Sequence, residues 1–289
     1  MIHPGKPRGI WLCADDYGMA PGVNAAIRQL IARGRLNATS VMVAAPFLNT
    51  EEAAALDALN SGKPRAAIGL HVTLSAPFRP MSEGFAPLRG GHFPTNNEMG
   101  RLAMTRRLKV ERLVIEVGTQ LRSFVDAFGR FPDFIDGHQH VHLFPQIRDA
   151  VLKVVAEASP QSWVRQCGAG RAHRSKRGGK ALTLDVLNLG FRRKAKLLGI
   201  RTNPAFAGAY DFTAMPDFAK LFPRFLAGMP EGGLIMCHPG FVDRELESLD
   251  PFTKQREREF AYLDSDEFPR VLTAHGLALA RPGEAAAAA

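Results

Sequence analysis

Carboxylate and imidazole side chains gather at four places in the chain, each directly after a stretch that is typical of a buried strand. They are Asp15 and Asp16, His71, the run from Asp136 through His138 and His140 to His142, and His238. These groups are ligands for divalent metal ions. One Asp and two His would leave coordination positions open for water and substrate, as metal-assisted hydrolysis requires. The adjacent Asp pair also allows one carboxylate to bind the ion while the other acts as a general base.

Each group also has an ordinary explanation. An Asp pair after a strand commonly forms a turn or caps a helix, and a single buried histidine such as His71 is commonly a core residue. Three histidines within five residues are rarer and favour metal or substrate binding. If the strand continued through residues 138–142, all three imidazoles would share one face, too many for one ion. The four groups together are stronger evidence for a functional site than any one of them, because all four are expected at the same end of the sheet.

Apolar runs and helical periodicity alternate along the chain about seven times. We expect strands at 9–14, 38–45, 66–74, 133–137, 163–167, 205–209 and 233–237, and helices at 21–33, 51–59, 107–128, 145–157, 181–199 and 215–227. Residues 76–100, rich in Pro and Gly, are expected to form a long loop. Continuous apolar strands predict a parallel sheet covered by helices, and a β/α barrel would bring the four polar groups to one rim. An open doubly wound sheet is the alternative, but no Gly-rich dinucleotide fingerprint follows the first strand.

Domain organisation and compartment follow from composition. No linker divides the chain, so we expect a single domain over residues 1–281 and a flexible Ala-rich tail at 282–289. No apolar run is long enough for a transmembrane helix, and no signal peptide can be drawn at the start. The three cysteines are odd in number and widely spaced, which predicts no disulfide framework and a cytoplasmic location.

Positive charge is concentrated in one segment. Residues 165–201 contain eleven Lys or Arg and one acid, Asp185, so they carry +10, and the remaining chain carries −1 of the total of +9. Such a segment is commonly a solvated helix face, but it could also contact an anionic lipid surface or a phosphorylated substrate. Nucleic acid is not an expected partner, because Phe191 is the segment's one aromatic residue and no stacking platform is present.

Several short motifs resemble those of a known family. They are Ala14-Asp15-Asp16-Tyr17-Gly18, Pro21-Gly22-Val23-Asn24, Thr39-Ser40-Val41-Met42, Ile68-Gly69-Leu70-His71-Val72-Thr73-Leu74, Asp136-Gly137-His138-Gln139-His140-Val141-His142 and Cys237-His238-Pro239-Gly240. These motifs and their order resemble those of the YdjC-like, or ChbG/HpnK, carbohydrate deacetylases. The resemblance covers this chain from residue 9 to about 263. Residues 160–203 match none of these motifs.

The resemblance implies a distorted TIM-like β/α barrel and a metal-dependent hydrolase that removes acetyl from N-acetylated sugars. It implies Asp16, His71 and His138 as metal ligands and Asp15 as the general base that takes a proton from a metal-activated water. We assign His238 by position as the acid that protonates the leaving amine. The remaining candidates either support the ligands or contact the sugar: Asp136, His140, His142 and Tyr17.

Several alternatives remain open on the sequence. Two imidazole ligands favour Zn²⁺, whereas an oxygen-rich shell that includes water would suit Mg²⁺. A homodimer is compatible with the family, but no sequence feature requires one. The rival functions are a phosphoesterase, which would use the basic segment to hold phosphate, and a non-catalytic sugar-binding barrel. A two-metal phosphoesterase needs more carboxylate ligands than the sequence offers, and a binding module would not need a free carboxylate beside the metal.

Overall fold

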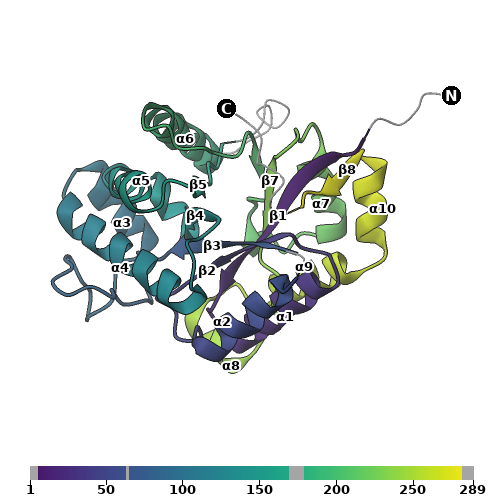
Figure 1. Cartoon of the computed structure of the whole chain (residues 1–289), viewed down its shortest axis with the longest axis horizontal. Helices are drawn as coiled ribbons and strands as arrows, with labels where there is room; N and C mark the ends of the chain where they lie inside the picture. The colour runs from purple at the N-terminus through teal and green to yellow at the C-terminus, as the bar shows by residue number, and fades with distance from the viewer. Residues whose placement is uncertain (1–5, 63–64, 169–178, 282–289) are drawn as a thin grey trace.

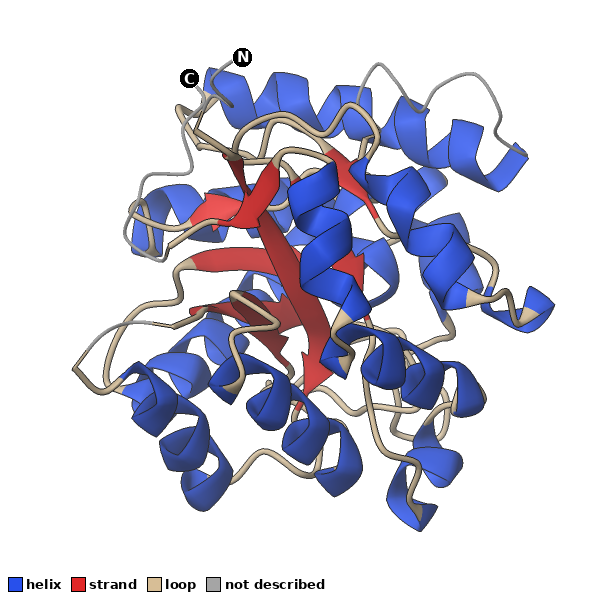
Figure 2. Cartoon of the chain, turned by 90° about the vertical axis from the view of Figure 1, so that its right-hand side faces the viewer, coloured by secondary structure: helices blue, strands red, loops and turns tan. Residues whose placement is uncertain are grey.

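The computed structural model describes residues 6–62, 65–168 and 179–281. Eight parallel strands form one curled sheet surrounded by helices (Figures 1 and 2). The strands are β1 (Arg8–Tyr17), β2 (Ala38–Val41), β3 (Ala67–Val72), β4 (Phe134–Gly137), β5 (Trp163–Val164), β6 (Phe206–Ala207), β7 (Leu234–Cys237) and β8 (Leu277–Leu279).

The strand order is that of an incompletely closed barrel. It runs β5-β4-β3-β2-β1-β7-β6, and β8 pairs with the beginning of β1. Neighbours in the sheet are neighbours in sequence, except that β1 pairs with both β8 and β7 and that a gap separates β5 from β6. A parallel bridge between Val164 and Thr202 lies at that gap. A doubly wound sheet would instead reverse its order at a switch point, so the prediction of a single-domain, distorted TIM-like barrel is confirmed.

Helices connect and cover these strands. They are α1 (Pro21–Ala32), α2 (Thr50–Asp57), α3 (Asn96–Met104), α4 (Val110–Phe128), α5 (Ile147–Ala158), α6 (Gly179–Leu197), α7 (Phe218–Leu226), α8 (Arg244–Leu249), α9 (Lys254–Asp264) and α10 (Glu267–Ala274), with short 3₁₀ segments η1 (Ala58–Asn60), η2 (His138–Leu143) and η4 (Phe212–Ala214). Helix α1 shows how the sequence specifies one of them. Pro21 fixes the first turn, and Val23, Ile27 and Leu30 recur at helical spacing and are fully buried against the sheet.

Three features differ from the sequence-based expectations. The loop expected over 76–100 ends at Thr95, whose hydroxyl accepts a hydrogen bond from the Glu98 amide and caps α3. Strand β8 and the helices between Arg244 and Ala274 were not predicted. The strand expected at 133–137 is confirmed, but it does not continue through 138–142, because β4 ends at Gly137 and the chain turns into η2, where Gln139 and His140 have φ of 53° and 59°. The expected tail at 282–289 lies outside the described residues.

Nearly every residue of the central strands is buried, which explains their continuous apolar runs. All residues of β2, β3, β4 and β7 are buried. A parallel strand covered on both faces needs apolar side chains on both. In these four strands the carboxylate and imidazole side chains, Asp136 and His71, lie near the carboxyl ends, where the site lies. Within the described ranges, no helix is both long and apolar enough to cross a membrane.

Candidate metal and catalytic site

Three donor atoms from three elements meet at the carboxyl ends of β1, β3 and β4. His138 Nδ1 lies 3.0 Å from Asp16 Oδ1, and His71 Nε2 lies 3.4 Å from the same oxygen. Ligand atoms of all three residues lie within 4.8 Å of one another, and all three side chains are buried. One carboxylate and two imidazoles at this spacing fit a divalent metal ion and leave positions open for other ligands.

The end of β1 is distorted, and this brings two neighbouring carboxylates to one pocket. Successive residues in a regular strand point to opposite faces. The pairing of β1 with β2 is irregular between Ala14 and Tyr17, and Asp16 has a φ of 75°. Both Asp15 and Asp16 consequently line the pocket. A non-glycine residue in this conformation is strained, a feature that concentrates at functional sites.

Two side chains hold His71 from behind. Asp136 Oδ1 lies 2.5 Å from His71 Nδ1, and Ser40 Oγ lies 3.0 Å from the same nitrogen. These contacts leave Nε2 facing Asp16, as in the carboxylate–histidine arrangement common at metal sites. Burial opposes a positive charge on His71, but the carboxylates of Asp136 and Asp16 raise its pKa to about 10. Surroundings that favour a proton on this imidazole also favour a metal cation, which competes for the same nitrogen.

A buried arginine fixes Asp15. The Arg165 guanidinium donates two hydrogen bonds to the Asp15 carboxylate, at 2.7 and 2.6 Å, and pairs with Asp136 Oδ2 at 2.5 Å. Burial alone would raise the pKa of Asp15, but Arg165 holds it well below its usual range. Asp15 is therefore ionised and held in one orientation. The basic segment 165–201 is thus not wholly a surface feature, because Arg165 is fully buried inside the site.

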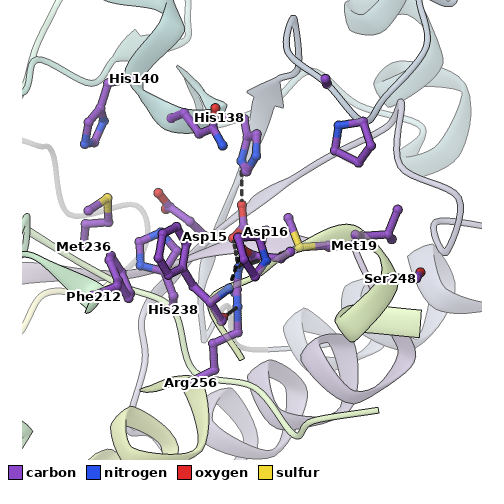
Figure 3. Close-up of a pocket in the computed structure, with 17 residues that line it drawn as sticks. Asp15, Asp16, Met19, His138, His140, Phe212, Met236, His238, Ser248 and Arg256 are labelled. Carbon is purple, nitrogen blue, oxygen red and sulfur yellow. Dashed lines mark hydrogen bonds and ion pairs between the residues drawn. The ribbon is translucent and has the colours of Figure 1, made fainter. Parts of the chain in front are cut away.

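A second arginine reaches Asp16 from α9. Arg256 Nη2 lies 2.6 Å from Asp16 Oδ2 and 2.5 Å from Asp250 Oδ2. Figure 3 shows His138 and Arg256 approaching Asp16 from opposite sides. One oxygen of Asp16 faces the imidazoles and the other faces Arg256. Burial would raise the pKa of Asp16, but Arg256 and His138 hold it well below its usual range.

His238 follows β7 and lines the same pocket. Its backbone N–H donates to Glu259 Oε2 at 2.6 Å, and the Tyr210 hydroxyl also bonds Glu259. Burial raises the pKa of Glu259 to about 7. The His238 ring packs edge-on against Phe212, and its Nδ1 has no hydrogen-bond partner among the described residues. Burial lowers the pKa of His238.

The pocket has a volume of about 450 Å³. That is within the usual range for a small-molecule site. Its lining combines the polar groups above with an apolar wall (Figure 3). Beyond Asp15, Asp16, His138, His140, His238 and Arg256, it comprises Met19, Ala76, Pro77, Gln139, Phe212, Met236, Ser248, Leu249, Asp250, Pro251 and Phe252.

The other sequence candidates take different places. His140 lines the pocket 3.5 Å from Cys167 Sγ, and burial lowers its pKa to about 3. His142 lies behind the site, where its Nε2 donates to the Arg165 carbonyl at 2.9 Å. Tyr17 points away from the pocket, and its hydroxyl bonds Glu52 and Arg28. Tyr17 and His142 are not among the residues that line the pocket.

Comparisons with known proteins identify the family of the chain and two of its relatives. The family described as YdjC-like protein matches residues 9–274. A chitooligosaccharide deacetylase of Escherichia fergusonii is 28% identical over 241 residues, covering 81% of this chain and 82% of the relative. A chitooligosaccharide deacetylase of Proteus mirabilis is 26% identical over 273 residues, covering 92% and 94%.

A solved structure shares the fold. It is a putative cellobiose-phosphate cleavage protein of Enterococcus faecalis, with a TM-score of 0.73, 22% identity, and coverage of 95% of this chain and 97% of that one. At that identity the likeness concerns the fold alone. The family match spans the barrel from β1 to α10 and includes every strand that contributes to the site. The chain therefore belongs to the YdjC-like family, as the motifs from Asp15 to His238 indicate.

Proposed function

We propose that this protein is a metal-dependent deacetylase that hydrolyses the acetamido group of an N-acetylated amino sugar or oligosaccharide. The observation that carries the proposal is the meeting of Asp16, His71 and His138 beside the fixed carboxylate of Asp15, at a pocket that Asp15, Asp16 and His138 line. The chitooligosaccharide deacetylases among its relatives supply the substrate class.

In the proposed reaction water adds to the acetyl carbonyl carbon, the C–N bond breaks, and acetate and a free amine leave. A divalent ion held by Asp16, His71 and His138 would polarise the carbonyl and lower the pKa of water. Asp15 takes the proton from the attacking water, and Arg165 keeps its carboxylate ionised and aimed. His238 delivers a proton to the departing nitrogen. Asp136 and Ser40 hold the His71 ring in place.

The identity of the ion stays open between zinc and magnesium. Two imidazoles favour Zn²⁺, whereas Asp16 together with water oxygens would suit Mg²⁺. Competition of the two ions for metal-stripped protein, read by elemental analysis, distinguishes them.

The deciding experiment is acetate release from chitobiose and a panel of other N-acetylated sugars. We expect no release by metal-stripped protein and release once zinc or magnesium is restored. Release that is unaffected by a chelator would contradict the metal-dependent mechanism. Sugar binding without release under any metal would favour the non-catalytic barrel instead.

The structure disfavours a two-metal phosphoesterase. A second group of candidate ligands exists in Cys13, Asp15 and Asp136, whose ligand atoms also lie within 4.8 Å of one another. The Arg165 guanidinium already lies among them, 2.6 Å from Asp15 Oδ1 and 3.1 Å from Cys13 Sγ. A second divalent ion would be brought against this fixed positive charge.

Aromatic residues of the pocket offer a face for the sugar ring. Phe212 and Phe252 both line it, with ring centroids 5.6 Å apart, and Phe252 is 40% exposed. We expect Phe252→Ala to raise KM about two- to tenfold, the size of an aromatic contact, and to leave kcat nearly unchanged. Steady-state kinetics on chitobiose measures this. Phe131→Ala is the matched control, because Phe131 is 44% exposed but does not line the pocket. A fall in kcat with unchanged KM would contradict the assignment.

Three finer expectations from the sequence stay predictions. They are a cytoplasmic location, a homodimer, and contact of residues 165–201 with an anionic lipid. The first is tested by fractionation of cells that produce the protein and the second by analytical ultracentrifugation. The third is developed below into a specific proposal for the exposed surface of α6.

A further inference from the structure

Helix α6 carries an unusual concentration of exposed aliphatic side chains. Val186, Leu189 and Leu197 are 62, 61 and 77% exposed, and these are the only large hydrophobic residues above 60% in the described part of the chain. Leu198 follows at 44%. Single exposed hydrophobic residues need no explanation, but a group on one helix indicates an interaction surface.

The helix has two distinct faces. Leu187, Phe191 and Ala195 are buried, and Phe191 packs edge-on against His142. Val186 and Leu189 on the opposite face continue through Arg193 to Leu197, at spacings of three and four residues that form one stripe. The inner face accounts for how α6 is attached to the fold, and the outer stripe has no function in that attachment.

Cations border the outer stripe. Arg192, Arg193 and Lys196 are exposed, and no ion pair joins them to another described residue. Lys194 differs, because it pairs with Asp149 of α5 at 2.6 Å and so helps to attach the helix. Val186, Leu189 and Leu197 together with the exposed cations Arg192, Arg193 and Lys196 form a surface that we call the α6 outer face.

We propose that the α6 outer face docks on an anionic lipid membrane surface. Aliphatic side chains would enter the boundary between headgroups and acyl chains, while the flanking cations contact the negatively charged headgroups. The long stems of Arg193 and Lys196 allow the charges to stay at headgroup level while the aliphatic side chains go deeper. Charge complementarity favours an anionic partner, since the segment 165–201 that contains this face carries +10.

Two other partners fit this face less well. In a symmetric dimer through α6, each basic face would meet its own copy, and like charges would oppose each other. Nucleic acid would satisfy the cations, but its phosphates offer nothing to Val186, Leu189 and Leu197, and no exposed aromatic side chain of α6 is available for stacking.

Docking here would bring the site close to the membrane. The inner face of α6 packs against η2, and the Cys167 amide, near His140, donates to Asn188 of α6. Since η2 supplies His138 and His140 to the pocket, a single helix separates the docking face from the site. The proposal does not depend on the deacetylase reaction, because membrane binding is measured without substrate.

The test is cosedimentation of the full-length protein with vesicles of phosphatidylserine and phosphatidylcholine, against pure phosphatidylcholine vesicles. We expect binding to the anionic vesicles, weakened by salt, and little to the neutral ones. The substitutions Arg192→Gln, Arg193→Gln and Lys196→Gln together should weaken binding about fivefold for each charge removed. Val186→Ser, Leu189→Ser and Leu197→Ser together should weaken it at least tenfold, because insertion is lost. Acetate release from chitobiose and the Tm should stay unchanged, since none of these residues touches the pocket.

Matched controls remove three other exposed cations, Lys220, Lys254 and Arg270, which lie on α7, α9 and α10. These substitutions should leave most of the binding intact. Equal binding to neutral vesicles, no binding at low salt, or full binding by the serine variant would each overturn the proposal. So would a dimer in analytical ultracentrifugation that the serine variant loses, or salt-dependent binding to duplex DNA, if either occurred without vesicle binding.

Discussion

Asp15→Asn is expected to lower kcat for acetate release by about 10²–10⁴-fold, the usual contribution of a general base. Asparagine keeps the size of the side chain and still accepts one hydrogen bond from Arg165, but it cannot take a proton. The three proposed metal ligands, Asp16, His71 and His138, are unchanged. Elemental analysis should therefore find the same metal content in the variant and the wild type, while acetate release falls.

The same assignment predicts the pH profile. Arg165 holds the pKa of Asp15 well below its usual range, so Asp15 is ionised at any pH above about 4, its ordinary value. An acidic limb of kcat/KM above that pH must then come from another group. Such a limb should have the same position whether Arg165 is present or replaced by Lys.

His140→Gln is a suitable control for Asp15→Asn. His140 also lines the pocket, but it is neutral and lies beside Cys167 rather than Asp16. We expect its loss to change kcat less than tenfold. If Asp15→Asn kept full activity, Asp15 would not be the base. The strongest replacement would be His238, which lines the pocket and whose Nδ1 has no hydrogen-bond partner among the described residues.

Strand ends explain why most of the site could be predicted from sequence. Asp16 and His71 follow apolar runs that can only be parallel strands, and such strands end at one rim. Once the strands are known to end at the same rim, residues 55 or more positions apart in sequence are expected to lie in one group. The family motifs then distinguish Asp16 from Asp15, which spacing alone does not.

Local backbone geometry explains what was misplaced. His138, His140 and His142 would share one face only if the strand continued past Gly137. The chain instead adopts positive φ at Gln139 and His140, so His138 reaches Asp16 while His142 turns behind the site. The distortion at the end of β1 similarly sends Tyr17 toward α2. Neither conformation follows from residue type alone, since positive φ is uncommon for every non-glycine residue, including Asp and His, in which it is enriched.

The two arginines were missed for a different reason. Arg165 and Arg256 have no neighbouring motif, and an arginine in a basic or mixed-charge segment is typical of a solvated surface. Their partners Asp15 and Asp16 lie 150 and 240 positions away. The available signal was electrostatic. Asp15, Asp16 and Asp136 were all expected to meet in one pocket, and carboxylates that become buried there require buried cations.

Arg165→Met is expected to destabilise the protein by about 3–5 kcal/mol, the cost of removing one partner of a buried ion pair. Methionine has a similar length but no charge, so Asp15 and Asp136 would remain buried without their shared cation. Arg165→Lys should lose less, because it keeps the charge but not the two parallel hydrogen bonds. Urea denaturation at pH 7 measures all three proteins. Arg28→Met is the control, since Arg28 pairs with Glu52 near the surface, where an ion pair contributes at most about 1 kcal/mol.

The pH dependence of this loss of stability provides a second test of the role of Arg165. In the wild type the pKa of Asp15 is lowered, so its contribution to stability is complete above the unfolded value of about 4 and is lost as the pH falls below it. In Arg165→Met the remaining buried carboxyl groups bind protons more tightly in the folded protein than in the unfolded chain, so they destabilise increasingly as the pH rises above 4. The deficit of the variant relative to wild type should therefore be smaller at pH 5 than at pH 7. An equal deficit at both values, or none, would mean that Arg165 is not the counter-charge of this site.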